Sequence, residues 1–317
     1  MRIKSINSCS ENDLWDYIPR DYLVFKGQLF IDFIRINMQA VDEPFLFQTE
    51  NKLIELNAER KLIAFQNLQL KKLLKPAGLI FHSARCGSTL LCNMLQSTEK
   101  CLVIRESGLI NKIFADTLID EDCRKWLYQL VVHFYCLYAL KEKKACIIKF
   151  TSHSSLNISW FHKPYAKVPW VYLLRKPEDV IHSLTSKPAG WCSNKVLKKS
   201  FRLKHEILPY NKLKQIELLL THQYQMIIDY FQQFKGLIAE YEKLVLSDLE
   251  AFNQITRWFN VKPNDDNKRI LQCLSFNAKT GEKMCLYPID VNNQKDNSEN
   301  QKERALCYEY YQKVCCL

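Results

Sequence analysis

The sequence has few glycines, no long apolar run and no regular metal-binding pattern. Seven glycines in 317 residues is a low number, so a glycine in a loop is informative about the backbone there. No apolar run approaches the roughly 18 residues of a membrane-spanning helix, and Met1 to Trp15 lacks the apolar core of a secretory signal. No Cys-x-x-Cys pair or zinc-like histidine spacing occurs. We therefore expect a cytoplasmic protein whose 13 cysteines are reduced.

The composition is that of a globular protein with an excess of positive charge. Hydrophobic residues make up 47% and charged residues 25% of the chain, and the formal net charge is +11. Such a charge favours a polyanionic ligand, nucleic acid or an anionic membrane face, without choosing between them. A basic stretch runs from Lys187 to Lys214 and contains a single acid, Glu206. Its cations are Lys187, Lys195, Lys198, Lys199, Arg202, Lys204, Lys212 and Lys214. It is either a solvated face or a wall that favours anionic substrates.

The stretch from Gly78 to Leu91 has the pattern of an anion-binding corner. Its first four residues form a short apolar strand, a loop of small polar residues follows, and an apolar helical pattern begins near Leu90. The first N–H groups of a helix lack partners within the helix and carry partial positive charge. Gly87 permits close approach of a ligand, and Arg85 adds a cation. An ordinary strand–turn–helix corner is the alternative interpretation.

This corner lacks the signature of a nucleotide-hydrolysing P-loop. The Walker pattern requires a lysine directly after its second glycine, whereas Ser88 follows Gly87 here. The leading glycine is also missing, because no glycine stands five residues before Gly87. The stretch is therefore a phosphate-binding loop in outline and not an NTPase motif.

Apolar strands and helices alternate along the chain after this corner. Strands are expected at 101–105, 145–150, 169–174 and 237–241, with helices over 121–140 and from Pro177 onward. A capping box at 247–250 predicts a further helix ending at Phe259. This alternation predicts an α/β fold with a central parallel sheet of about five strands flanked by helices. Residues 1–75 are expected to form a mainly helical extension packed on the core, and 288–317 a polar, partly disordered tail.

Several polar residues fall at the ends of the expected strands. In parallel sheets, ligands bind at the carboxyl ends of the strands. The residues at these ends are Arg85, Glu106, Lys149, His153 and Arg175. Their convergence predicts one ligand site at this edge of the sheet.

A second stretch, Arg175-Lys-Pro-Glu-Asp-Val-Ile-His-Ser183, stands after the fourth expected strand. Together with His82-Ser-Ala-Arg-Cys-Gly-Ser-Thr89, it resembles the sulfotransferase family, in particular its carbohydrate and bacterial-type branch. These enzymes have a P-loop NTPase-like fold and use 3′-phosphoadenosine-5′-phosphosulfate (PAPS). The resemblance covers roughly 78–285 and implies a sulfotransferase domain over 76–287.

The resemblance implies roles for individual residues. It places Arg85 beside the bridging oxygen of the donor, and the 3′-phosphate on Arg175 and Ser183. It assigns Lys149 to the transferring group and Tyr241 to the adenosine. The loop around the phosphosulfate then comprises Cys86, Gly87, Ser88 and Thr89, where Cys86 replaces a common serine. Lys279 lies in a weaker match to a later loop on the 3′-phosphate.

The implied activity is transfer of a sulfuryl group from PAPS to a hydroxyl or amine of a carbohydrate or small-molecule acceptor, leaving 3′-phosphoadenosine-5′-phosphate (PAP). Arg85 and Lys149 would stabilise the charge that develops in the transition state, and no metal is needed. Glu106 is the first candidate for the base that takes the acceptor's proton, and His153 is the second. We expect no membrane span and no nucleic-acid partner.

Two other classes of protein fit parts of the sequence. A P-loop kinase-like enzyme is disfavoured by the missing lysine after Gly87. A non-catalytic protein of the same fold could bind anionic partners through the basic stretch. The acceptor itself is not encoded in any motif that we recognise.

Overall fold

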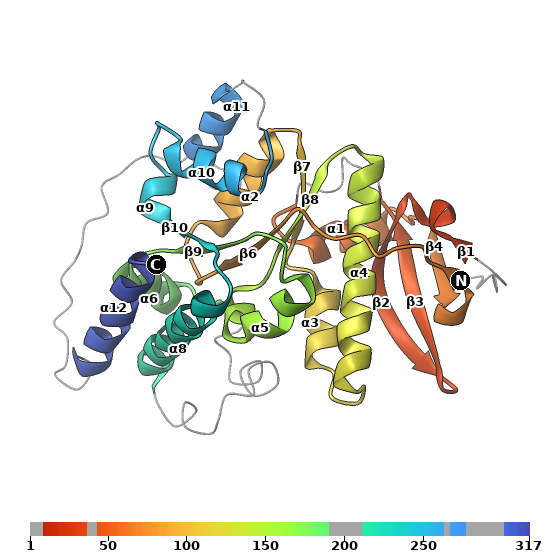
Figure 1. Ribbon diagram of the computed structural model, residues 1–317, viewed down its shortest axis with the longest axis horizontal. Helices are drawn as coiled ribbons and strands as arrows, with labels where there is room; N and C mark the ends of the chain where they lie inside the picture. Colours follow the sequence, from red (N-terminus) through yellow and green to blue (C-terminus); the bar gives the residue numbers. More distant parts are fainter. Residues whose placement is uncertain (1–8, 37–42, 190–210, 263–266, 277–300) are drawn as a thin grey trace. The chain divides into compact units, whose positions relative to one another are not determined.

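The computed structural model describes residues 9–36, 43–189, 211–262, 267–276 and 301–317 (Figure 1). Contacts divide the chain into two compact units. The first comprises Met1–Leu79 and Glu99–Phe150, and the second comprises Ile80–Thr98 and Thr151–Leu317. None of the helices in the described ranges is both long and apolar enough to span a membrane.

The N-terminal part of the first unit is a three-stranded antiparallel sheet. The strands β2 (Tyr17–Phe25), β3 (Gln28–Arg35) and β4 (Arg60–Ala64) follow in the order β2-β3-β4. Lys26 and Gly27 join β2 to β3, and both have positive φ angles, of 50° and 74°. A two-residue turn of this kind matches the twist of a hairpin. The short strands β1 (Cys9–Ser10) and β5 (Leu68–Gln69) pair in parallel.

The prediction of a mainly helical extension over 1–75 is therefore wrong. Its described part contains these strands and a single α-helix, α1 (Leu46–Glu55). The helix ends at Glu55, and β4 follows from Arg60. The turn at Lys26 and Gly27 is the local signal that the sequence analysis missed.

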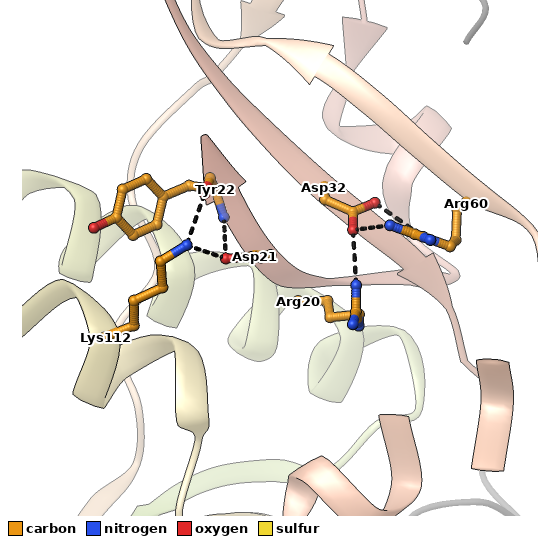
Figure 2. A network of polar contacts seen from close by, with 6 residues as sticks. All are labelled: Arg20, Asp21, Tyr22, Asp32, Arg60 and Lys112. Atoms are coloured by element: carbon orange, nitrogen blue, oxygen red, sulfur yellow. Dashed lines mark hydrogen bonds and ion pairs between the residues drawn. The ribbon is translucent and has the colours of Figure 1, made fainter. Parts of the chain in front are cut away.

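A polar network ties the three strands together (Figure 2). Asp32 of β3 is only 5% exposed and lies between two arginines of the neighbouring strands. It accepts a hydrogen bond from Nη1 of Arg20 at 3.1 Å and another from Nε of Arg60 at 3.2 Å. Lys112 of α3 (Gly108–Ala115) donates to Asp21 at 2.6 Å and so joins the hairpin to the helix. Paired in this way, the buried carboxylate of Asp32 cross-links the sheet.

The rest of the first unit is a parallel strand pair covered by a long helix. β7 (Cys101–Arg105) and β8 (Ala145–Lys149) pair in parallel with Arg105 opposite Lys149. α4 (Glu121–Lys141) packs on β2, β7 and β8, and Figure 1 shows it alongside the hairpin. Its N-terminus is capped by Asp120, whose carboxylate accepts a 2.8 Å hydrogen bond from the amide of Cys123. The helix predicted over 121–140 is confirmed.

The second unit consists of parallel strands and helices. β9 (Trp170–Leu174) pairs in parallel with β10 (Leu237–Glu240), while β6 (Gly78–His82) begins in the first unit and ends in this one. The α-helices are α2 (Ser88–Ser97), α5 (Ile158–His162), α6 (Pro177–Ser186), α8 (Lys212–Gln233), α9 (Tyr241–Leu244), α10 (Glu250–Trp258), α11 (Asn267–Gln272) and α12 (Gln301–Cys315). In the described residues of both units, the short 3₁₀ helices are η1 (Glu11–Leu14), η3 (Phe65–Asn67), η4 (Ser152–Asn157), η5 (Lys163–Tyr165) and η7 (Cys273–Ser275).

The five parallel strands form one sheet in the order β10-β9-β6-β8-β7. The predicted α/β fold with a central parallel sheet flanked by helices is confirmed, and each predicted strand agrees with the observed one to within a residue at either end. Every residue of β6, β7 and β9 is buried. Apolar strands covered on both faces have this burial pattern.

The helix predicted to end at Phe259 is confirmed as α10, but its predicted cap is wrong, and the predicted tail contains an additional helix. Ser247 is not an N-cap, because α10 begins at Glu250 after Leu249 with a φ of 58°, and the amide of Glu250 donates to Asp248. Part of the expected tail is ordered, since residues 301–315 form α12, which packs on α8. The polar composition conceals three buried apolar residues of α12, which are Cys307, Tyr311 and Val314.

Candidate functional site

The loop between β6 and α2 has the backbone shape of an anion-binding corner. Arg85 has a φ of 57°, and Gly87, with a φ of 78°, is the N-cap of α2. The amide of Ser83 donates to the carbonyl of Leu173 at 3.0 Å, which fixes the start of the loop to β9. The amides of the first turn of α2 have no acceptors within the helix. This part of the second unit can therefore hold an anionic group.

The aromatic ring of Tyr241 lies directly on Gly87. A Cβ atom at position 87 would stand 2.7 Å from Cε2 of Tyr241 and closer still to Cδ2. The guanidinium carbon of Arg175 lies 4.7 Å from the centre of the same ring. Tyr241 thus brings together the loop before α2 and the arginine that follows β9. Three residues that the sequence analysis took from separate motifs form one stack in the second unit.

Arg175 is held in place by a carboxylate on α6, the helix that follows it. Its Nε atom donates to Oδ2 of Asp179 at 3.1 Å, and Nη2 lies 3.0 Å from the same oxygen. Within the described ranges no hydrogen bond or ion pair is formed by Nη1, so this atom can donate to a ligand oxygen. Ser183 is half-buried farther along α6. The amide of Lys176 donates to Oε1 of Glu242 at 3.3 Å, which joins α6 to α9.

Arg85 contacts the backbone at the end of α6. Its Nη2 atom donates to the carbonyl oxygen of Lys187. Lys187 is the first residue of the basic stretch, and Lys212 and Lys214 begin α8 at the other end of that stretch. The remaining five cations of this stretch, Lys195, Lys198, Lys199, Arg202 and Lys204, lie outside the described residues.

The other residues of the loop are buried. Cys86 is not exposed at all, and Ser88 and Thr89 are 7% and 6% exposed. A thiol without access to solvent is a poor target for modification, so Cys86 is a packing residue in this structure. Ser88 and Thr89 occupy the first turn of α2, where hydroxyl groups can supplement the backbone donors.

The first unit contains a second cluster, formed by Lys149 and Glu106. Glu106 follows β7 with a φ of 52°, and its amide donates to the carbonyl of Lys149 at 2.8 Å. The ammonium group of Lys149, only 1% exposed, forms an ion pair with the carboxylate of Glu106. It also lies 5.8 Å from the centre of the Phe45 ring. The parallel register of β7 and β8 brings these two side chains together.

Two further predicted site residues contribute less. His153 lies in η4 of the second unit, with Nε2 3.0 Å from Oγ1 of Thr151. Lys279 lies outside the described residues. Within the described ranges, no group of three or more His, Cys, Asp or Glu side chains is arranged to hold a metal ion.

The sequence analysis missed three residues that shape these clusters. Asp179 has a local signal, since it stands four residues after Arg175 beside the helix start at Pro177. Glu242 directly follows Tyr241, but its bond to Lys176 has no signal in the sequence. Phe45 reaches Lys149 from a segment far away in the chain, and only the tertiary fold reveals it.

Comparison with known proteins relates the chain to two sulfotransferase structures. The sulfotransferase STF9 from Mycobacterium avium is 10% identical, with a TM-score of 0.51 and 77% of each chain covered. The sulfotransferase domain from the Synechococcus PCC 7002 olefin synthase is 15% identical, with a TM-score of 0.46, 77% of this chain and 97% of that chain covered. No family model and no curated protein matches the sequence.

The similarity to STF9 extends over 77% of each chain, and the central parallel sheet with its flanking helices is consistent with the sulfotransferase fold. At this level of identity, the comparison concerns the fold. The resemblance predicted from the two sequence motifs is therefore confirmed at that level: the chain has the sulfotransferase fold.

Proposed function

We propose that this protein is a sulfotransferase that transfers a sulfuryl group from PAPS to a hydroxyl or amine of a carbohydrate or small-molecule acceptor. The observation that carries the proposal is the stack of Gly87, Tyr241 and Arg175 in the second unit. It joins a helix N-terminus, an aromatic ring and an arginine with an open edge. A nucleotide with a 5′-phosphosulfate and a separate 3′-phosphate matches these features in charge and composition.

The chemistry requires few protein groups. The acceptor oxygen or nitrogen forms a bond to sulfur, the bond between sulfur and the bridging oxygen breaks, and its electron pair stays on the phosphate of PAP. We assign stabilisation of the developing negative charge to Arg85, Lys149 and the first amides of α2. Arg85 acts electrostatically, because a guanidinium does not readily release a proton.

The acceptor loses a proton in this reaction, and we assign its removal to Glu106. The carboxylate of Glu106 is 20% exposed and is paired with Lys149. His153, bonded to Thr151, is the alternative base. If Glu106 is the base, Glu106→Gln should abolish turnover without weakening PAP binding, whereas His153→Ala should retain turnover. The reverse pattern would assign the proton to His153.

The donor is tested by thermal denaturation with PAP, AMP, or ADP plus Mg²⁺. A ligand at about 100 times its Kd stabilises the folded state by roughly 2.7 kcal/mol. PAP should raise the Tm by several degrees and AMP much less, and Arg175→Ala should abolish the PAP effect. A shift with ADP and Mg²⁺ alone would instead indicate a kinase-like enzyme. Absence of any shift would indicate the non-catalytic alternative.

A further inference from the structure

We infer that the C-terminal helix α12 is a positioning element for the donor nucleotide, and that its docking and nucleotide binding stabilise each other. The inference rests on the proposed function, because it concerns the site that contains Arg175 and Tyr241. All residues that carry it belong to the second unit.

The helix is fastened to the unit by buried contacts. Cys307 and Val314 are completely buried, and Tyr311 is 6% exposed. The ring of Tyr311 meets that of Tyr224 of α8 edge to face, with centroids 6.1 Å apart. Figure 1 shows α12 running beside α8 and α6. These contacts bury apolar surface, which is a favourable term for docking.

An ion pair adds to this attachment. Glu217 of α8 has a fully buried side chain, and its Oε1 atom accepts a 3.2 Å hydrogen bond from Nε of Arg304. Removing the partner of a buried carboxylate is costly, because the charge loses a favourable interaction but remains out of water. Arg304 therefore anchors the docked α12 to α8 at a buried carboxylate.

The docked helix contacts the two elements that support the stack. It packs on α6, which directly follows Arg175 and Lys176, and on β10, whose last residue precedes Tyr241. Burial raises the pKa of the Tyr311 hydroxyl, and Cys315, Glu242 and Glu240 raise it further. The bond from the amide of Lys176 to Glu242 then joins α9 to α6. Undocking of α12 would remove support from both sides of the stack at once.

This arrangement has a reciprocal thermodynamic consequence. If the nucleotide binds the docked state more tightly, it must also favour docking by the same factor. Conversely, the apparent affinity falls with the fraction of molecules in which α12 is docked. Binding of the 3′-phosphate should be most sensitive to undocking of α12. Arg175 is the proposed ligand for this phosphate, and it directly precedes α6, which α12 contacts.

The first experiment is amide hydrogen exchange of the full chain with and without PAP. We expect PAP to slow exchange in residues 304–315 at least fivefold, and expect no such effect in Arg175→Ala. Binding of PAP with unchanged exchange in α12 would overturn this inference and leave the proposed function standing. Failure of the wild-type protein to bind PAP would overturn both.

The second experiment uses variants and titration calorimetry. Arg304→Ala should weaken PAP binding at least fivefold and AMP binding much less, and Glu217→Gln in the same chain should restore PAP binding by removing the buried charge. The control is Lys313→Ala, which breaks an exposed pair with Glu309 on the same helix and should change neither affinity. Equal weakening of PAP and AMP, or no rescue, would show a merely structural role. All variants are first tested for folding by circular dichroism.

Discussion

The charged candidate site residues of the two units differ in how deeply they are buried. In the first unit Lys149 is 1% exposed and pairs with Glu106, whereas in the second Arg175 is 18% exposed and pairs with Asp179, which is 36% exposed. A buried ion is expensive to leave without its partner, while an exposed helical pair contributes little to stability. The first pair should therefore matter for folding as well as chemistry. The second should matter almost entirely for ligand binding.

The largest expected effect on stability concerns Glu50, another buried acid of the first unit. Burial raises its pKa from the ordinary value of 4.5 to about 8. The folded state therefore holds a proton that the unfolded state releases above pH 4.5, and stability should fall as the pH rises through this range. Each unit of pKa difference corresponds to roughly 1.4 kcal/mol, so the free energy of unfolding should be lower by about 5 kcal/mol at pH 8.

Urea unfolding at several pH values would measure this loss, with Glu50→Gln as the variant. The amide is neutral at every pH, so the variant should lose most of the slope and be more stable than wild type above pH 8. An unchanged slope in Glu50→Gln would mean that another group binds the proton.

The next largest effect on stability distinguishes Glu106 from Lys149, the two members of the first-unit ion pair. Glu106→Ala leaves the buried ammonium of Lys149 without its carboxylate and should cost about 3 kcal/mol. Lys149→Met should cost less, because the remaining carboxylate of Glu106 is 20% exposed and can reach water. Urea unfolding near neutral pH gives both values. Equal costs would contradict the claim that burial of the ammonium decides the result.

A smaller effect compares two glycines with left-handed backbone. Gly87→Ala adds both backbone strain and a clash with Tyr241. It should lower the free energy of unfolding by about 2 kcal/mol and should also remove PAP binding. Gly27→Ala, at a φ of 74° with no atom within 4 Å of the added Cβ, is the matched control. It should cost about 1 kcal/mol and leave PAP binding intact. Thermal melts with and without PAP would show whether Tyr241 makes the difference.

The smallest effect on stability is expected from the second pair. Arg175→Ala should lower the free energy of unfolding by under ~0.5 kcal/mol, because a pair at i, i+4 spacing that is partly in contact with water contributes little. The same variant should abolish the PAP-induced rise in Tm. A large loss of stability without ligand would show that Arg175 is structural, and the contrast between the units would fail.

The sheet and the second-unit site could be predicted because their signals are local. Apolar runs such as Cys101–Arg105 are buried on both faces, so their composition alone identifies them as strands. Pro177 begins α6, as expected from its fixed φ angle. Because parallel strands end at the same edge, Arg175 and the loop at Gly87 could be expected to lie close together.

Other features depend on contacts that no local pattern contains. The hairpin β2–β3 could have been found from the turn at Lys26 and Gly27, but its apolar runs also fit a helix. In α12, the spacing of Cys307, Tyr311 and Val314 is helical, although the surrounding composition is that of a tail. The approach of Phe45 to Lys149 results from tertiary packing alone.

The packing of Tyr241 on Gly87 also has an evolutionary consequence. Because the ring occupies the space that a Cβ would need, position 87 accepts a side chain only if position 241 changes as well. A descendant that gains a side chain at position 87 should carry a smaller residue at position 241, and one that keeps the aromatic ring should keep the glycine. The pair should therefore appear as correlated substitutions among natural variants, although the two residues are far apart in the chain.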